Sequence, residues 1–379
     1  MSNKVPQIRF NGYSDAWEER KLGELVEQII REVPKPNKPY YRMSVRSHAK
    51  GTFKQFVDNP ENVAMDKLFV VKKDDLVVNI TFAWEHAIAV VNEENDGLLV
   101  SHRFPTYRAD GKSDIEFLHH VVSKENFRRK LEFISPGGAG RNRVLNKKDF
   151  LKLKIFVPKI EEQQKIGSFF KQLDNTIALH QRKLDLLKEQ KKGYLQKMFP
   201  KNGAKVPELR FAGFADDWEE RKFKDILKTY SFRSYLANAS DHGKYEVIQQ
   251  GDNPLVGYSD GIPFMDYKDI ILFGDHTVSL YKPQSPFFIS TDGVKILSAD
   301  NFEGNYLYTT LERYKPDSQG YKRHFTILKN QELWFTRNVE EQQKVGSFFK
   351  QLDNNIALQQ KKISLLKDQK KGLLQKMFI

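Results

Sequence analysis

Apolar residues recur at alternating steps of four and three in two stretches of the chain, residues 161–199 and 340–378. A mean spacing of 3.5 residues is typical of a coiled coil, because it keeps one seam facing a partner helix. The pattern predicts two helices of 39 residues, each roughly 58 Å long. Pro200 and Gly203 should end the first one. The first seam consists of Ile166, Phe170, Leu173, Ile177, His180, Leu184, Leu187, Lys191, Tyr194 and Met198. The second consists of Val345, Phe349, Leu352, Ile356, Gln359, Ile363, Leu366, Lys370, Leu373 and Met377.

The same two stretches are near-identical in sequence, with 31 of 39 residues matching at an offset of 179. A second, weaker repeat pairs residues 5–25 with residues 206–226, with 11 identities in 21 positions. The segments between these matches do not resemble each other. The chain therefore contains two copies of the same pair of repeated segments, each copy flanking a different variable region. We call these segments, residues 5–25 with 161–199 and residues 206–226 with 340–378, the frame.

Two equivalent halves imply a pseudo-two-fold axis, and an isologous contact across that axis sets matching helices antiparallel. We therefore expect an α+β fold with two globular α/β domains, residues 1–157 and 200–336. An intramolecular antiparallel coiled coil, formed by residues 158–199 and 337–379, should separate them. The alternative is that each helix packs on its own neighbouring domain.

The variable regions, residues 26–156 and 227–336, carry the short β-type runs and Gly, Asn and Asp turns of mixed α/β domains. The runs expected to form strands are 76–80, 87–91, 98–100, 246–249, 270–273, 286–290 and 306–309. Residues 115–122 are expected to form a helix.

The formal net charge of +13 and the pI of about 9.4 favour a polyanionic partner. The alternative is a basic protein whose charge serves solubility. Lysines gather late in each long helix, at Lys188, Lys191, Lys192, Lys197, Lys367, Lys370, Lys371 and Lys376. They fit either the negative end of the helix dipole or contact with DNA phosphates or an acidic partner.

The chain has no cysteine, which excludes disulfides, thiolate zinc sites and cysteine nucleophiles. No apolar run is long enough for a signal peptide or a bilayer span, so a cytoplasmic location is expected.

Candidate base-reading residues are those with paired donors, since Arg suits guanine and Asn or Gln suits adenine. Residues 137–144 and 319–325 each contain basic residues that follow a glycine. The glycine lets the backbone approach a phosphate. In the first domain the candidates are Arg42, Arg46, Lys50, Lys54, Trp84, Arg103, Arg141, Asn142 and Arg143. In the second they are Gln249, Gln250, His276, Lys295, Lys322, Arg323 and His324. Any one of them could instead be a solvated surface residue, and Trp84 could be core.

The sequence predicts no catalytic or metal centre. The Gly-rich residues 136–142 lack the lysine and hydroxyl of a phosphate-binding loop. Residues 58–60 and 252–254 lack the second proline and the aromatic residue of an amino-methyltransferase loop. The histidines show no metal-ligand spacing.

The duplication and its motifs resemble the specificity subunit of a type I restriction–modification system. The resemblance rests on EEQQKIGSFFKQLD (161–174) and EEQQKVGSFFKQLD (340–353), and on the endings KKGYLQKMF and KKGLLQKMF. Within the variable regions, residues 75–90 and 100–108 resemble one kind of target-recognition domain. Residues 271–277, 287–297 and 320–324 resemble another. The first helix is preceded by Pro158, as in the family, whereas Arg337 stands at that position in the second. Glu85 also departs from the family pattern.

The resemblance implies that each recognition domain reads one half of a bipartite, asymmetric double-stranded DNA site, with the coiled coil setting the spacer. It also implies docking of two modification subunits that bind S-adenosylmethionine, and recruitment of restriction subunits that use ATP and Mg. No reaction is expected from this chain itself. The alternatives are a coiled-coil scaffold and, less favoured by the missing motifs, a fused methyltransferase or nuclease.

Overall fold

The computed structural model describes residues 5–109, 111–137, 143–201, 203–320 and 322–379. It divides into two compact units, Met1–Leu179 with Ile363–Ile379 (unit 1) and His180–Lys362 (unit 2). Each unit thus contains the beginning of one long helix and the end of the other. The long helices are α5 (Ile160–Lys197) and α9 (Val339–Lys376).

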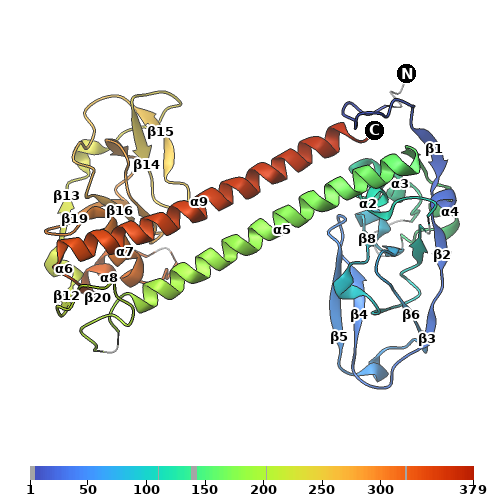
Figure 1. The fold of residues 1–379 in the computed structure, drawn as a ribbon, viewed down its shortest axis with the longest axis horizontal. Helices are drawn as coiled ribbons and strands as arrows, with labels where there is room; N and C mark the ends of the chain where they lie inside the picture. Colours follow the sequence, from blue (N-terminus) through green and yellow to red (C-terminus); the bar gives the residue numbers. More distant parts are fainter. Residues whose placement is uncertain (1–4, 110, 138–142, 202, 321) are drawn as a thin grey trace. The chain divides into compact units, whose positions relative to one another are not determined.

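Unit 1 holds three sheets and a set of short helices (Figure 1). The five-stranded sheet has the order β3 (Glu32–Pro34), β6 (Lys67–Val70), β9 (Leu99–Val100), β4 (Tyr40–Val45), β5 (Thr52–Val57). The four-stranded sheet has the order β2 (Glu27–Ile29), β10 (Thr106–Arg108), β7 (Leu76–Val78), β8 (Ile88–Val90). A third sheet pairs β1 (Glu18–Lys21) with β11 (Lys154–Val157). The helices are α1 (Leu22–Leu25), α2 (Ile115–Val122), α3 (Glu125–Phe133) and α4 (Lys147–Lys152), with 3-10 turns η1 (Pro60–Asn62), η2 (Ala83–Glu85) and η3 (Glu93–Asn95).

Unit 2 repeats part of this plan with a different second sheet. A four-stranded sheet has the order β13 (Leu227–Tyr230), β19 (Val294–Ala299), β16 (Ile271–Gly274), β17 (Leu280–Tyr281). A three-stranded sheet has the order β15 (Leu255–Ser259), β14 (Tyr245–Ile248), β18 (Phe287–Ile289), and β12 (Glu219–Lys222) pairs with β20 (Glu332–Phe335). The helices are α6 (Phe223–Ile226), α7 (Gly304–Tyr314) and α8 (Phe325–Asn330), with η5 at Arg233–Tyr235.

The beginning of each long helix is fixed by residues of both repeats. Arg9 donates to both carboxylate oxygens of Glu162, at 2.6 and 2.7 Å, and Arg210 does the same to Glu341, at 2.6 and 2.9 Å. Both glutamates are fully buried. A bidentate arginine–carboxylate contact fixes the orientation of the two side chains as well as their distance. The segment that contains each arginine is therefore held against the start of its helix.

A glycine one turn further along each helix lets a second helix approach closely. A Cβ at Gly167 would lie 3.0 Å from the backbone nitrogen of Phe117, and one at Gly346 would lie 2.7 Å from that of Tyr306. These contacts are with the first turns of α2 and α7. Glycine is required here by proximity to a neighbouring backbone rather than by its own backbone angles.

The end of each long helix is buried in the other helix's starting unit. Phe378 lies against Trp17, Phe117 and Phe170 in unit 1, with ring centroids 5.4–6.1 Å apart. Its repeat counterpart Phe199 lies 5.5 Å from Trp218 in unit 2. The repeat ending Met–Phe is therefore a core element, and each aromatic core contains both long helices.

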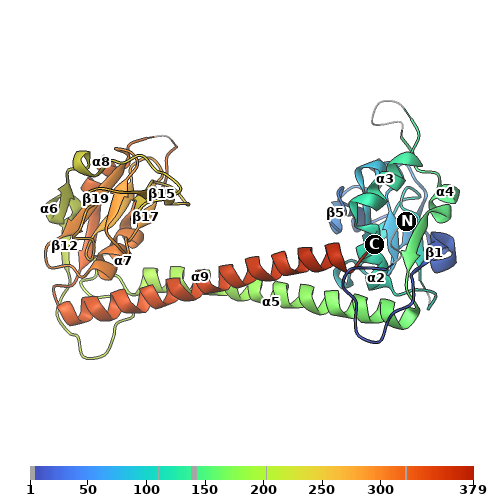
Figure 2. The same ribbon diagram turned by 90° about the horizontal axis from the view of Figure 1, so that it is seen from above.

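Within each unit α5 and α9 run side by side in opposite directions (Figures 1 and 2). In unit 1 Lys370 bonds Asp174 at 2.5 Å; in unit 2 Lys191 bonds Asp353 at 2.5 Å, and Gln359 bonds the ring of His180 at 2.6 Å. All twenty predicted seam positions are buried or half-buried. The antiparallel helix pair is confirmed, and packing of each helix on its own domain alone is excluded. Lys191 and Lys370 are occupied by carboxylates of the chain itself.

Most of the expected short elements are found, with one error. Helix α2 has the expected bounds, and strands overlap six of the seven expected runs. Residues 306–309 were expected to be a strand but belong to helix α7. Its first turn is capped by Glu303, whose carboxylate accepts from Tyr306 N at 2.8 Å, and Tyr306, Leu307, Thr310 and Leu311 are buried on one side. Burial of that face outweighs the β preference of Tyr and Thr.

Replacing Phe378 by Ala should destabilise unit 1 by about 3–5 kcal/mol, because it empties a shared aromatic site. Phe199→Ala should do the same to unit 2. Hydrogen–deuterium exchange resolved by peptide will show which unit loses protection. Leu365→Ala, at a side chain 66% exposed, is the control and should change little. Equal loss of protection in both units of the Phe378 variant would contradict this assignment.

Unit 1 should lose stability as the pH falls from about 6.5. Burial, then His119 and Lys370, lower the pKa of His120 to about 3. Between pH 6.5 and about 3, the unfolded chain binds a proton on His120 and the native state does not. The free energy of unfolding therefore decreases by up to about 1.4 kcal/mol for each pH unit that the pH is lowered in this range. Urea unfolding at pH 7.5 and 5 should show this loss, His120→Phe should reduce it, and the exposed-site control His102→Gln should not. An unchanged slope in the His120 variant would refute the assignment.

Candidate nucleic-acid interface

Several sequence-predicted readers of unit 1 lie on the hairpin of β4 and β5. Along β4, Met43 and Val45 are buried, whereas Arg42 is exposed, as the alternation of a strand requires. Arg46, one residue beyond the strand, is exposed as well. Lys54 lies on β5, opposite Met43, and is exposed, as is Lys50 in the turn. The inward Met43 and Val45 hold the hairpin to the core, and Arg42 lies on the other face. Lys54, as the cross-strand partner of Met43, is exposed on the Met43 face.

Arg42, Arg46 and Arg103 are held by neutral partners. Arg42 Nε donates to Gln55 Oε1 across the strand pair at 3.0 Å, and Arg103 donates to the Thr81 hydroxyl at 3.3 Å. Arg46 donates to the carbonyl of Thr52 at 2.5 Å and lies 4.8 Å from the Phe53 ring centroid. Every other described arginine of unit 1 forms an ion pair with a described carboxylate. These three positive charges are therefore left uncompensated within the described part of the unit.

The loop of residues 79–87 lies beside the hairpin and is anchored on both sides. His86 has a left-handed φ of 64°, and its Nε2 contacts the carbonyl of Val122 at 2.6 Å. Burial lowers the pKa of this imidazole. Glu85, the departure from the family pattern, accepts from the Ser47 hydroxyl at 2.6 Å, so it ties this loop to the β4–β5 turn.

Trp84 and Arg143 form a second small group. The Arg143 guanidinium lies 5.4 Å from the Trp84 ring centroid, donates to the carbonyl of Ser135 and pairs with Glu132 at 3.7 Å. Trp84 is half-buried, and its indole nitrogen is buried without a described partner. Arg141 and Asn142 lie outside the described residues.

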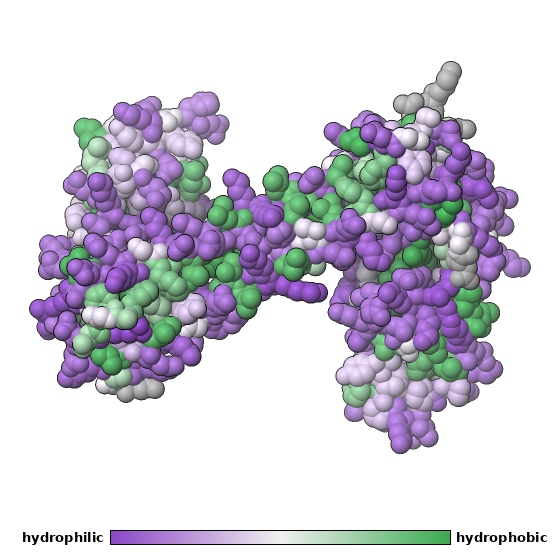
Figure 3. All heavy atoms as spheres, in the orientation of Figure 1, coloured by the Kyte–Doolittle hydropathy of each residue, from purple (hydrophilic) through white to green (hydrophobic). Residues whose placement is uncertain are grey.

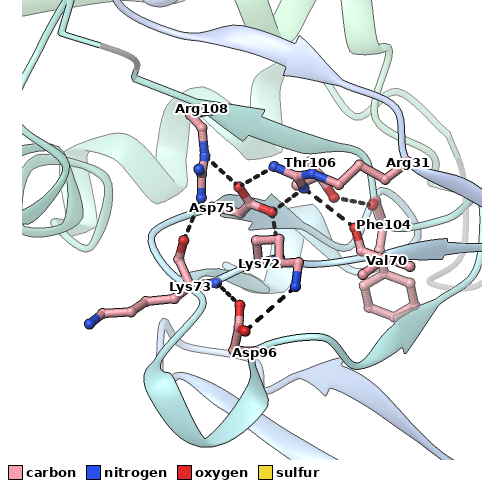
Figure 4. Close-up of polar contacts among 9 residues, drawn as sticks. All are labelled: Arg31, Val70, Lys72, Lys73, Asp75, Asp96, Phe104, Thr106 and Arg108. Carbon is pink, nitrogen blue, oxygen red and sulfur yellow. Dashed lines mark hydrogen bonds and ion pairs between the residues drawn. The ribbon is translucent and has the colours of Figure 1, made fainter.

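Asp75 joins the strands that carry these loops (Figure 4). Its carboxylate is completely buried and accepts from Arg31 at 2.6 and 3.2 Å and from Arg108 at 2.9 Å. The backbone nitrogen of Lys72 donates to it at 2.7 Å. Two arginines and one amide compensate the buried charge, which fixes β7 relative to β10 and to the start of β3.

In unit 2 a buried aspartate holds the predicted basic stretch. Asp275 accepts from the backbone nitrogen of Phe325 at 2.8 Å. His324 is completely buried; its Nδ1 contacts the Asp275 carbonyl at 3.0 Å and its Nε2 accepts from Gln319 N at 2.9 Å. With both ring nitrogens used, His324 positions the loop, and we remove it from the set of base-reading residues.

The remaining unit 2 candidates divide into internal and exposed side chains. Gln250 accepts from the backbone nitrogen of His276 at 2.9 Å and packs against Gly293, so it is part of the scaffold. Gln249 donates to the carbonyl of Asn253 at 2.9 Å, and Lys295 donates to that of Asp292 at 2.7 Å. Lys322 and Arg323 are exposed, and the imidazole of His276 contacts the Lys322 carbonyl at 3.2 Å.

Sequence reasoning missed Gln55, Asn79 and the two buried aspartates. Gln55 lies on the same face as Arg42 because the two residues are cross-strand partners, a register that the sequence does not indicate. The arginines that bind Asp75 and the Phe325 nitrogen that binds Asp275 come from more than 30 positions away, so local sequence does not indicate these contacts. Among the described residues there is no cluster of His, Cys, Asp and Glu that could hold a metal ion. No described helix is long and apolar enough to cross a membrane.

Replacing Asp75 by Asn should lower the free energy of unfolding of unit 1 by about 3 kcal/mol, because two arginines would face an uncharged group. Denaturant unfolding of the full chain gives the loss. Glu93→Gln is the matched control, since that carboxylate is 77% exposed and pairs only at the surface with Lys73. Equal stability of the two variants would mean that the buried cluster contributes little.

Comparison with known proteins agrees with this organisation. The family model described as type I restriction modification DNA specificity domain matches twice, at residues 14–189 and 215–368. The putative type I restriction enzyme MjaX specificity subunit of Methanocaldococcus jannaschii is 22% identical, over 94% of this chain and 92% of its own length. The MjaVIII specificity subunit of the same organism is 27% identical over 31% of this chain.

A solved structure has the same fold. The S subunit of a type I restriction–modification system from M. genitalium superimposes with a TM-score of 0.66 at 15% identity, covering 99% of both chains. Together the two family matches cover most of the sequence, one on each copy of the frame. The chain therefore belongs to the type I restriction–modification DNA specificity family and is a non-catalytic specificity subunit.

Proposed function

We propose that each unit reads one half of a bipartite, asymmetric site on double-stranded DNA. The observation that carries this proposal is a duplicated frame that holds two dissimilar sheets, five-stranded in unit 1 and three-stranded in unit 2. Dissimilar surfaces read dissimilar sequences. The arginines without carboxylate partners in unit 1 and the exposed Lys322 and Arg323 in unit 2 supply charge for phosphates and donors for base edges.

The helix pair then acts as the spacer between the half-sites. Each long helix has 38 residues, about 57 Å at 1.5 Å per residue, without interruption. The seam side chains and the anchored helix ends support a stiff element. Readers on one face of B-DNA are about one turn, roughly 34 Å, apart, and the helices are long enough to span that separation.

The outer faces of the same helices would dock two modification subunits. Apolar side chains are visible among hydrophilic ones on the long helices (Figure 3). Leu179 and Leu186 of α5 are 64% and 58% exposed, and Leu358 and Leu365 of α9 are each 66% exposed. These pairs are related by the repeat offset, so each helix offers the same side chains to an identical partner. S-adenosylmethionine would bind on the modification subunits, and ATP and Mg on restriction subunits. The complex would act in the cytoplasm.

Lengthening both helices equally should lengthen the unread spacer and leave both half-sequences unchanged. We would insert four helix-forming residues after Gln181 and four after Gln360, which are equivalent repeat positions. The added 6 Å or so corresponds to roughly two base pairs. Methylome sequencing of a strain expressing the variant with its modification subunits gives the new site.

An insertion in α5 alone is the control. It moves the seam of one helix past the other, so it should lower stability and methylation rather than produce a new spacer. A change of half-sequence with the double insertion would refute the spacer role. The absence of any methylated motif with the unaltered chain and its partners would refute the function as a whole.

A further inference from the structure

A pocket of about 280 Å³ opens on unit 1 between the β4–β5 hairpin and the loops that follow β7 and β9. Two of the uncompensated arginines, Arg42 and Arg103, line it from opposite elements. Gln55, Asn79 and Thr81 line it beside them. No carboxylate is among the described residues that line it. The pocket therefore gathers hydrogen-bonding groups and positive charge in one place.

The bonds inside the pocket fix which atoms of its amides are free. Because Arg42 Nε can only donate, Gln55 must present Oε1 to it, at 3.0 Å. The backbone nitrogen of Thr81 likewise requires Oδ1 of Asn79, at 3.1 Å. Each of these amide oxygens already accepts one bond within the protein, and each NH₂ group remains as a donor. Together with the guanidinium groups, the free nitrogens of the pocket are all donors.

Aromatic side chains form part of the pocket wall. Phe82 lines the pocket and is 41% exposed, although it is a large apolar side chain. Tyr40 and Phe104 line it as well, and the Tyr40 hydroxyl is buried without a described partner. Apolar ring surface beside a set of donors can contact the edge of a stacked base that presents its acceptors in the major groove.

We infer that this pocket reads a guanine in the half-site of unit 1, with Arg42 and Arg103 as specificity-determining residues. The inference rests on the proposed function, that unit 1 reads DNA. In the major groove guanine presents two acceptors, O6 and N7. Adenine and cytosine each present an amino donor there, which would face the donors of the pocket, and thymine presents one acceptor and a methyl group.

The test uses the full chain in complex with its modification subunits and duplexes that carry its methylated motif. Each guanine of the motif is replaced in turn by 7-deazaguanine, which lacks the N7 acceptor. At one position of one half-site this change should weaken binding roughly tenfold. Arg42→Gln or Arg103→Gln should weaken binding to the normal duplex by a similar factor, and should remove the penalty of 7-deazaguanine at that same position.

Two further variants separate base reading from charge and from misfolding. Arg129→Gln removes the same charge from α3, where the side chain is 71% exposed and lies outside the pocket. It should keep the full 7-deazaguanine penalty. Arg103→Lys keeps the charge but loses the planar fork, so it should bind DNA while discriminating less at that position. Thermal unfolding confirms that each variant is folded.

Three results would overturn the inference. The first is a motif in which no half-site responds to 7-deazaguanine. The second is a penalty that persists unchanged in the arginine variants. The third is a loss of affinity that is equal for all sequences, which would make Arg42 and Arg103 phosphate contacts and leave the proposed function intact. If the unaltered complex binds no sequence preferentially, the proposed function fails and the inference fails with it.

Discussion

Burial of both ends of each long helix in separate aromatic cores is the constraint on which the rest of the molecule depends. Phe170, in the first half of α5, lies in the same cluster as Phe378, which follows the end of α9. Phe349 and Phe199 make the corresponding pair with Trp218 in unit 2. Neither core is complete with one helix alone, so folding of each unit requires that both helices form and lie antiparallel. The packing of the heptad seam is therefore held in place by the two buried helix ends as well as by the contacts of the seam itself.

Electrostatic pairing separates the structural arginines from those on the proposed reading surface. Arg9 and Arg210 each bind a buried glutamate, and Arg31 and Arg108 share Asp75. These cations are desolvated and directed by a carboxylate, so removing either partner leaves a buried or half-buried charge. The arginines on the proposed reading face have neutral described partners that orient the guanidinium without cancelling its charge. An arginine with a carboxylate partner is thus structural, whereas an arginine with a neutral partner keeps a charge that a ligand could use.

What could be predicted from sequence follows from how local each interaction is. The seam of α5 and α9 was predictable because a helix repeats its face every few residues, and the duplication revealed the symmetry. The burial of His324 and the helical state of residues 306–309 were not, since both depend on groups brought in from elsewhere, Asp275 in one case and the core beneath α7 in the other. The arginines of β4 were chosen for their chemistry, whereas their distinguishing feature, the lack of a carboxylate partner, exists only in three dimensions.

The frame can carry unlike domains because its contacts with them are made largely to backbone. Gln163 accepts from the backbone nitrogen of Asp114 and donates to the carbonyl of Pro158. Gln342 accepts from the backbone nitrogen of Glu303 and donates to the carbonyls of Asn301 and Thr336. The glycines one turn later also meet backbone atoms. Backbone groups are present whatever the side chains are, so a helix start that recognises them places few demands on the sequence of the domain beside it. The residues that differ between the two units are thereby left free to differ where they face a ligand.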